Sequence, residues 1–174
     1  MRRGYTADDY RRLIDRIRRR LPQASIATDV IVGFPDETDE QFRRSYDLLA
    51  ELRLDVAHLA RYSPRPGTVA ARRMPDDVPP EEKERRFRAL EELQSDIAAQ
   101  INGRLIGETL EVLVEGEHAA TRRGGPHHRW KGRTRTNKLV FFDSAEDLRR
   151  ELVAVRIEWA GPWSLVGKPV TSYQ

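Results

Sequence analysis

Apolar residues recur at helical spacing in three segments of the first hundred residues. The first segment follows Thr6, which can accept a hydrogen bond at a helix N-cap, and Pro22 ends it. The second begins at Thr38, which can form a capping box with Gln41. The third opens at Pro80 and extends to about residue 102. The inward-facing positions expected for the three helices are Tyr10, Leu13, Ile14, Ile17 and Leu21, then Phe42, Tyr46, Leu49 and Leu52, then Phe87, Leu90, Gln94, Ile97 and Ile101.

Two β-rich runs lie between these helices, at residues 25–34 and 54–62. Strand, helix and strand within about 40 residues form a βαβ unit, whose two strands run parallel. A parallel sheet is normally covered on both faces, which three helices and two strands cannot achieve. We therefore expect this half of the chain to be part of a larger α/β domain.

The pattern changes from Gly107 onward. Short strand-like runs alternate with Gly, Asn, Asp and Pro: TLEVLVEG, HAATRR, RWKGRTR, KLVFFD, ELVAVRIEWA and SLVGKPVTS. Five or six short strands in about 65 residues predict a small antiparallel β-barrel. The expected domains are therefore residues 1–105 and residues 106–174.

The composition is that of a soluble globular protein, with 39% hydrophobic and 34% charged residues in 174. No apolar run approaches the roughly 18–20 residues that span a membrane, so no membrane association is expected. The chain has no cysteine, which excludes disulfides and thiolate metal sites and fits a cytoplasmic location. Adjacent histidines, His127 and His128, would point to opposite faces of a strand, so we expect no metal site there.

One run, RRGGPHHRWKGRTRTNK at residues 122–138, holds seven Lys or Arg and no acidic residue, although the net charge of the chain is only +3. In a strand, the alternating cations Arg129, Lys131, Arg133 and Arg135 share one face. Trp130 takes the other face, or stacks on a base if the strand twists. Cations with an aromatic residue on a small β-barrel are typical of single-stranded nucleic-acid binding. The alternative is a solvated charged hairpin.

A second candidate site lies where the two parallel strands end, at GFPDET (33–38) and YSPRPGT (62–68). Functional groups of α/β folds gather at this edge of the sheet. The two loops offer a backbone that a ligand can approach, a hydroxyl and a cation, but ordinary turn chemistry explains them equally. Asp29, within the apolar strand, is either a site residue or the partner of an arginine.

Several motifs, taken together and in order, cover nearly the whole chain: RRGYT (2–6), TDVIVGFPDET (28–38), YSPRPGTVAA (62–71), Lys83 and Arg86 as K-x-x-R, VLVEG (112–116), GRTRTNKLVFF (132–142) and SLVGKPV (164–170). In these motifs the chain resembles the MiaB-type tRNA methylthiotransferases. The resemblance implies an α/β plus β fold. It consists of the last part of a radical SAM partial (β/α) barrel, followed by a TRAM domain, a small OB-like barrel that binds RNA.

Members of this family convert N6-isopentenyladenosine next to the tRNA anticodon into its 2-methylthio derivative. They use S-adenosylmethionine and two 4Fe-4S clusters held by cysteines. This chain has no cysteine, so the resemblance implies that the cluster ligands and catalytic residues belong to an upstream part of the same enzyme, and that this fragment alone is inactive. Asp36 departs from the family, which usually has glycine there, and asks for either a different backbone conformation or a tolerated left-handed residue at that turn.

The resemblance also implies which residues bind ligands. Those expected at the S-adenosylmethionine cavity are Val32, Gly33, Phe34, Pro35, Arg61, Ser63 and Arg65. Those expected against the tRNA anticodon stem-loop are Arg129, Trp130, Lys131, Arg133, Arg135, Asn137 and Lys138. Four to five phosphate contacts would give a log–log salt slope of roughly −3 to −5.

Two other readings stay open at this point. The sister enzymes of the same family methylthiolate a ribosomal protein, in which case the barrel would hold protein instead of RNA. A stand-alone RNA-binding module without enzyme function is the second alternative.

Overall fold

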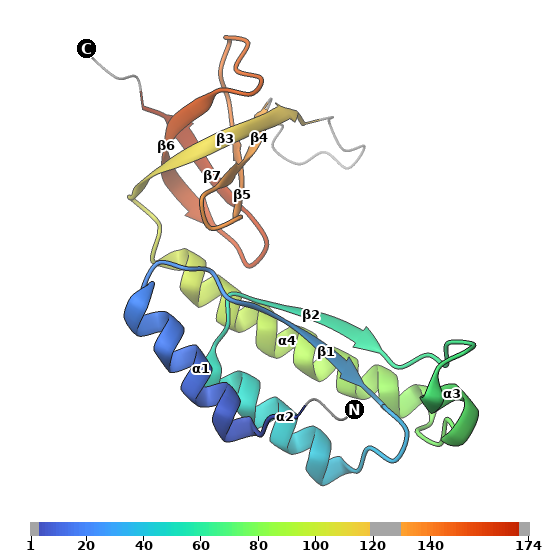
Figure 1. Ribbon diagram of the computed structural model, residues 1–174. Helices are drawn as coiled ribbons and strands as arrows, with labels where there is room; N and C mark the ends of the chain where they lie inside the picture. The colour runs from blue at the N-terminus through green and yellow to red at the C-terminus, as the bar shows by residue number, and fades with distance from the viewer. Residues whose placement is uncertain (1–3, 119–129, 171–174) are drawn as a thin grey trace. The chain divides into compact units, whose positions relative to one another are not determined.

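The computed structural model describes residues 4–118 and 130–170, and the chain divides into two compact units, Met1–Ile97 and Ala98–Gln174 (Figure 1). The elements before the barrel are α1 (Ala7–Arg20), β1 (Ala27–Val32), α2 (Asp39–Leu52), β2 (Val56–Arg61), α3 (Val69–Arg73) and α4 (Pro80–Gly103). Helix α4 contains the division between the units. The domain boundary near residue 105 stays a prediction.

The three long helices begin where their caps predict. The Thr6 hydroxyl oxygen accepts a hydrogen bond from the Asp9 backbone N–H at 3.2 Å. Thr38 accepts from the Gln41 N–H at 3.2 Å, and the Gln41 side chain accepts from the Thr38 N–H at 3.1 Å. The predicted capping box is therefore confirmed, and it fixes the chain direction as the loop after β1 enters α2.

Helix α3 lies between β2 and α4, in a segment for which the apolar pattern predicts no helix. It is only five residues long, too short for apolar periodicity to reveal. Thr68 caps it by accepting a hydrogen bond from the Ala71 N–H at 3.2 Å. The loop after β2 is thereby given a defined shape at the edge of the sheet.

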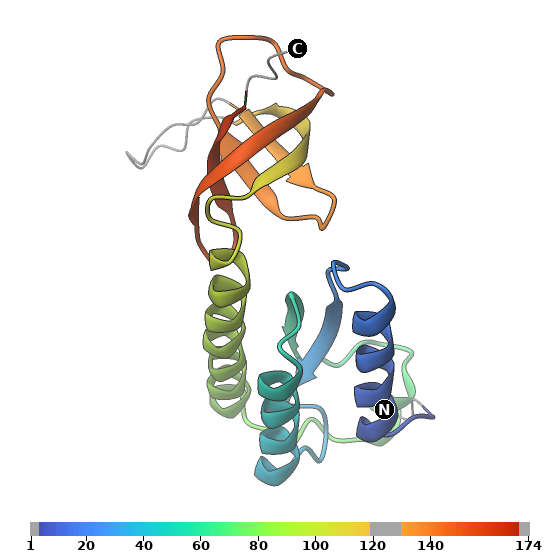
Figure 2. The ribbon, with the colours of Figure 1, turned by 90° about the vertical axis from the view of Figure 1, so that its left-hand side faces the viewer.

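Strands β1 and β2 form a two-stranded parallel sheet, as the βαβ pattern predicts, with a register that runs from Ala27 opposite Val56 to Val32 opposite Arg61. Helix α2 lies between α1 and α4 (Figure 2). Side chains from both strands pack with α2 and α4 in one core of Val32, Phe42, Leu49, Ala57 and Leu90. The helices thus cover the sheet face that carries Val32 and Ala57.

The opposite face of this sheet is open. Asp29, Ile31, His58 and Ala60 alternate with the buried positions of their strands and are exposed. Ile31 is 39% exposed, although it lies in the continuous apolar run of β1. This bears out the expectation that three helices cannot cover both faces of the sheet.

The second unit contains a closed barrel of five strands: β3 (Thr109–Glu117), β4 (Trp130–Thr134), β5 (Leu139–Phe142), β6 (Leu152–Ala160) and β7 (Leu165–Pro169). The strand order is β3-β4-β5-β7-β6, and pairing of β6 with β3 closes the barrel (Figure 2). Its core holds Val112, Val114, Trp130, Val140, Phe142, Val155, Ile157 and Leu165.

The barrel is not antiparallel throughout, which corrects the prediction. Strands β5 and β7 run parallel, from Val140 opposite Leu165 to Phe142 opposite Gly167. The reason is topological: the chain passes from β5 to β6 by a longer connection and returns in a hairpin, so β7 takes the direction of β5. The predicted strand HAATRR lies largely outside the described residues.

Across residues 4–118 and 130–170, no helix has the length and apolar character needed to cross a membrane.

Candidate ligand cavity and nucleic-acid interface

A cavity of about 950 Å³ opens at the edge of the sheet where β1 and β2 end. Four of the seven residues expected at the cofactor cavity line it, namely Phe34, Arg61, Ser63 and Arg65. The rest of its wall is Ile31, Ala60, Tyr62, Thr68, Val69, Ala70, Arg73 and Met74. Both strand-end loops and α3 therefore contribute to one concave surface, as expected for the carboxyl edge of parallel strands.

Two aromatic rings form part of this wall. Phe34 and Tyr62 meet edge to face, with ring centroids 5.1 Å apart and planes at 70°. Such a pair is a stable apolar surface. Arg65, Arg73 and the Ser63 hydroxyl add polar groups around it. A ligand with an apolar or flat part and an anionic group suits this combination.

The other three expected cofactor residues, Val32, Gly33 and Pro35, do not line the cavity. Val32 is 2% exposed and packs in the core, because alternate side chains of β1 point to opposite faces and Ile31 takes the cavity side. Pro35 is buried and does not line the cavity. Arg61 touches the wall, but its guanidinium pairs with Glu84 and lies 5.6 Å from the centre of the Phe87 ring.

The space beside Gly33 is occupied by the Lys83 side chain and does not open toward the cavity. The φ of Gly33 is +69°, and a Cβ built there would lie 2.3 Å from Cγ of Lys83. Lys83 is itself only 6% exposed, and its amine donates to the Tyr62 carbonyl at 3.4 Å and pairs with Asp76. One lysine of α4 therefore contacts both strand-end loops.

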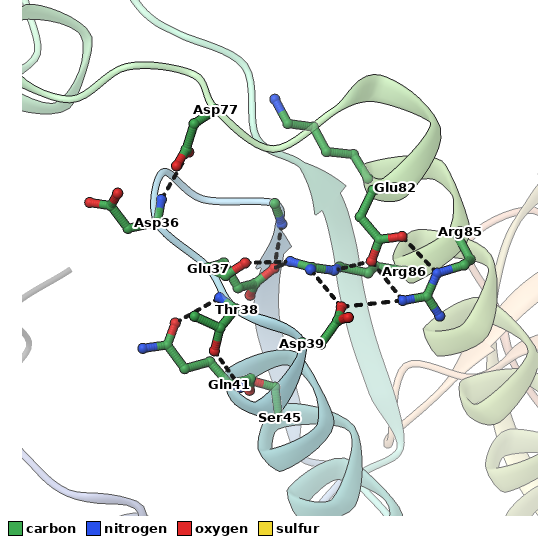
Figure 3. A network of polar contacts seen from close by, with 12 residues as sticks. Asp36, Glu37, Thr38, Asp39, Gln41, Ser45, Asp77, Glu82, Arg85 and Arg86 are labelled. Atoms are coloured by element: carbon green, nitrogen blue, oxygen red, sulfur yellow. Dashed lines mark hydrogen bonds and ion pairs between the residues drawn. The ribbon is translucent and has the colours of Figure 1, made fainter.

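Arg86, one helical turn further along α4, forms the centre of a polar network under the loop after β1 (Figure 3). Its side chain is 4% exposed. It donates to the Glu37 carbonyl at 2.9 Å and to the carboxylates of Glu37, Asp39 and Glu82 at 2.8, 2.9 and 2.7 Å. The Glu37 carboxylate in turn accepts from the Gly33 N–H at 2.7 Å. The loop is thus bonded at both ends.

The contacts of the network shift the pKa values of Glu82 and Arg86. Hydrogen bonds from Arg85 and then Arg86, opposed by burial, lower the pKa of Glu82 to about 2. Burial lowers the pKa of Arg86, but its hydrogen bonds to Glu37, Glu82 and Asp39 together outweigh that effect and raise it. A buried cation with this many partners holds its neighbours in fixed positions.

Sequence reasoning gave no role to Lys83 or Arg86, because charged residues on a helix usually face solvent. Their place on the face that carries Phe87 and Leu90 was the available signal. Of the two alternatives for Asp36, the left-handed conformation is the one observed, since its φ is +64° and its N–H donates to Asp77 at 3.0 Å. Asp29 is exposed on the open sheet face and forms no ion pair with an arginine among the described residues.

In the barrel, Trp130 is buried, which corrects its assignment as a stacking residue. It is 0% exposed, and its indole N–H donates to the Ser144 carbonyl at 3.2 Å. The alternation of β4 sends Trp130 and Gly132 inward and Lys131 and Arg133 outward. Trp130 cannot stack on a base while the barrel is closed.

The outward side chains of three neighbouring strands form what we term the β3–β4–β5 face: Glu111, Leu113, Glu115, Lys131, Arg133, Leu139 and Phe141. Arg135, Asn137 and Lys138 follow in the turn between β4 and β5, where Asn137 has a φ of +60°. The Asn137 carbonyl accepts a hydrogen bond from Arg133 at 3.1 Å, so it shapes the turn. Arg129 lies outside the described residues.

Carboxylates of β3 accompany the arginines of this face. Arg135 lies 2.7 Å from the Glu111 carboxylate, and Arg133 lies 3.6 Å from that of Glu115. Leu113, between the two glutamates, is the direct neighbour of Arg133 across the strand pair. The basic run contains no acidic residue in the sequence, but in the folded barrel acidic side chains of β3 lie next to Arg133 and Arg135.

An aromatic pair that sequence reasoning missed adjoins the same cations. The rings of Phe141 and His118 are 4.7 Å apart, and Phe141 is the cross-strand neighbour of Lys131. Phe141 is half-buried on the outer side of β5, while Phe142 points into the core. The period-two pattern of KLVFF, aligned with that of RWKGRTR, was the signal that could have found it.

Within the part of the chain that the structure describes, no group of three or more His, Cys, Asp or Glu side chains could hold a metal ion. His127 and His128 lie outside the described residues.

Residues 103–170, which contain the barrel, match the TRAM domain family. The chain as a whole is similar to a group of proteins named tRNA-2-methylthio-N(6)-dimethylallyladenosine synthase. The relative from Dehalococcoides mccartyi is 46% identical over 170 residues, covering 98% of this chain and 39% of that protein. The relative from Chloroflexus aurantiacus is 48% identical over 172 residues, covering 97% of this chain and 35% of that protein.

The relative from Acetivibrio thermocellus is 42% identical over 170 residues, covering 98% of this chain and 34% of that protein. The resemblance to tRNA methylthiotransferases that the motifs indicate is therefore confirmed over nearly the whole chain. The chain spans little more than a third of the length of the curated relatives it matches.

Proposed function

We propose that this chain is part of a tRNA-modifying methylthiotransferase, which adds a methylthio group at C2 of N6-isopentenyladenosine next to the anticodon. The single observation that supports this most is the 46–48% identity to proteins of that name across both units of the chain. A shared RNA-binding barrel alone would give similarity only in the second unit. On this proposal the site of action is cytoplasmic, where tRNA is modified.

The barrel would hold the tRNA, with the anticodon stem-loop as the contacted part. Lys131, Arg133, Arg135 and Lys138 are the described cations that would contact phosphates, and Asn137 would shape the turn next to them. Phe141, beside Lys131, replaces Trp130 as the aromatic side chain available for a base. Arg129 lies outside the described residues, so its proposed contact with RNA depends on the sequence alone.

The first unit would contribute part of the wall around S-adenosylmethionine. Phe34 and Tyr62 offer an apolar surface for the adenine ring, and Ser63 and Arg65 offer a hydroxyl and a cation for its polar groups. Lys83 and Arg86 would act behind this wall by fixing both loops. The 4Fe-4S clusters that the reaction requires would be held by cysteine thiolates, and this chain has no cysteine. We therefore expect it to bind RNA but not to methylthiolate it alone.

The test is a titration of this chain against a labelled anticodon stem-loop RNA, in parallel with a titration against the ribosomal protein that the sister enzymes modify. We expect binding to the RNA only, weakening as salt rises. Because Arg133 and Arg135 each begin in an ion pair with a glutamate, we expect a slope near the shallow end of the range, about −3.

Binding to the ribosomal protein instead of the RNA would favour the sister class. RNA binding with a salt slope near zero would remove the electrostatic part of the proposal. If the parent protein binds RNA but transfers no methylthio group when its clusters are loaded, a stand-alone binding role would be favoured.

A further inference from the structure

We propose that Glu111 and Glu115 determine the RNA specificity of the β3–β4–β5 face. Glu111 pairs with Arg135 and Glu115 pairs with Arg133 until suitably spaced phosphates of an RNA take the place of the two carboxylates. This inference rests on the proposed function of the barrel in RNA binding. It gives a role to two acidic residues that would otherwise only weaken the binding of a polyanion.

The two glutamates lie on the outer side of β3, next to the two arginines with which they pair. Glu111 and Glu115 are both outward residues of β3, separated by Leu113, and they pair with Arg135 and Arg133 at 2.7 and 3.6 Å. Leu113 faces Arg133 on one side and Leu152 of β6 on the other, and both leucines are exposed. The arginines therefore start from defined positions beside an apolar strip.

These ion pairs can be exchanged. The Arg135 side chain is 81% exposed and its partner 42%, so water and salt screen the pair. Exposed pairs of this kind contribute little to stability. A phosphate offers guanidinium two oxygens in a fork that matches its donors, and its charge is part of a polyanion. A phosphate can thus take the place of the carboxylate without disturbing the barrel.

The displaced carboxylate remains a few ångströms away and repels the phosphate that displaced it. An RNA that engages Arg133, Arg135 and Lys131 together gains enough contacts to offset this repulsion. An RNA that reaches only one arginine does not. The two glutamates therefore weaken poorly fitted RNAs more than well-fitted ones, which is how repulsive elements create specificity.

The experiment compares the double variant Glu111→Gln/Glu115→Gln with the wild-type chain, by fluorescence anisotropy with two RNAs. One is the anticodon stem-loop, and the other is a short uridine oligomer. We expect affinity for the oligomer to rise about tenfold and affinity for the stem-loop to rise no more than about threefold. The salt slope for the oligomer should steepen by about 1 to 1.5, because each freed arginine adds roughly 0.7.

The matched control is Glu158→Gln, which removes a glutamate paired with Lys168 at 2.9 Å on the outer side of β6 and β7. It should change neither RNA's affinity appreciably. An equal gain for both RNAs, or a gain that Glu158→Gln reproduces, would overturn the inference in favour of net charge alone.

The outcomes also separate this inference from the function on which it rests. Wild-type binding to the stem-loop with no change in the double variant overturns the inference and leaves the proposed function standing. Failure of the wild-type chain to bind either RNA overturns both.

Discussion

Arg86 in the first unit and Arg135 in the second are both bonded to glutamate, yet they differ almost completely in burial. The Arg86 side chain is 4% exposed and has three carboxylate partners, whereas the Arg135 side chain is 81% exposed and pairs with Glu111. Removal of a buried partner leaves an uncompensated charge, while removal of an exposed one leaves a solvated charge. The same chemistry therefore fixes a loop in one unit and stays available to a ligand in the other.

The two units can be followed separately in one unfolding experiment. All three tryptophans, Trp130, Trp159 and Trp163, lie in the barrel unit, so indole fluorescence reports on the barrel. The helical signal in circular dichroism comes mainly from α1, α2 and most of α4 in the first unit. Each variant below is assessed with both signals.

The largest effect is expected from Arg86→Ala. It leaves Glu37, which is 14% exposed, without its cation and removes four hydrogen bonds: two to Glu37 in the loop after β1, one to Asp39 at the start of α2 and one to Glu82 of α4. We expect the free energy of unfolding of the first unit to fall by about 3–5 kcal/mol, measured by urea denaturation followed by circular dichroism.

Arg88→Ala is the matched control for that variant, because Arg88 is an arginine of the same helix paired with Glu84 but 70% exposed. It should leave the helical transition where it is. Equal losses for Arg86→Ala and Arg88→Ala would contradict the distinction by burial.

The next largest effect is expected from Gly33→Ala. The substitution puts a Cβ on a residue with φ of +69° and within 2.3 Å of the Lys83 stem, whose amine is held by Tyr62 and Asp76. A loss of about 1–3 kcal/mol in the first unit is expected from the same urea experiment. Gly67→Ala is informative beside it, since Gly67 has a φ of +85° but open space around it. The excess for Gly33→Ala then measures the Lys83 contact alone.

A smaller, pH-dependent effect is expected from Glu82→Gln. The folded-state pKa of Glu82 is about 2, below its ordinary 4.5, so its ionised form stabilises the fold above about pH 4.5 and this contribution is lost as pH falls toward 2. The variant should therefore be less stable than wild type at pH 7, and the difference should shrink as the pH falls through this window. A difference that is constant between pH 7 and pH 3 would show that the ionised carboxylate is not the cause.

The smallest effect on stability is expected from Arg133→Ala/Arg135→Ala. Both side chains are exposed, and their carboxylate partners are solvated once the pairs are removed. The fluorescence transition of the barrel should coincide with that of the wild type. A large shift would mean that these pairs support the barrel itself.

Much of the fold could be predicted from the sequence because its signals are local. The caps at Thr6 and Thr38, the βαβ unit and the switch to short strands after residue 107 each depend on neighbouring residues. Helix α3 was missed because one turn has no periodicity, and the parallel pairing of β5 with β7 was missed because it depends on how a long connection returns.

The candidate sites were less predictable, because they depend on contacts between distant residues. Strand alternation correctly separated Trp130 from Lys131 and Arg133, but it could not show that the indole is sealed in the core. The burial of Arg86 has one local sign, its place on the helix face that carries Leu90, but its partners Glu37 and Asp39 are distant in the sequence. The pairing of Glu111 with Arg135 needs the register of β3 and β4, which only the assembled barrel supplies.

We expect the exposed arginines of the β3–β4–β5 face and its turn to bind RNA while contributing nothing measurable to the fold. A salt-dependent titration of Arg133→Ala/Arg135→Ala against the anticodon stem-loop tests it most directly, beside Arg88→Ala/Arg149→Ala, which removes two other exposed arginines that are paired with carboxylates. We expect the first variant to lose about tenfold or more in affinity with a shallower salt slope, and the second to bind like the wild type. Equal affinities for the two variants would contradict the claim and leave the basic run a solvated hairpin.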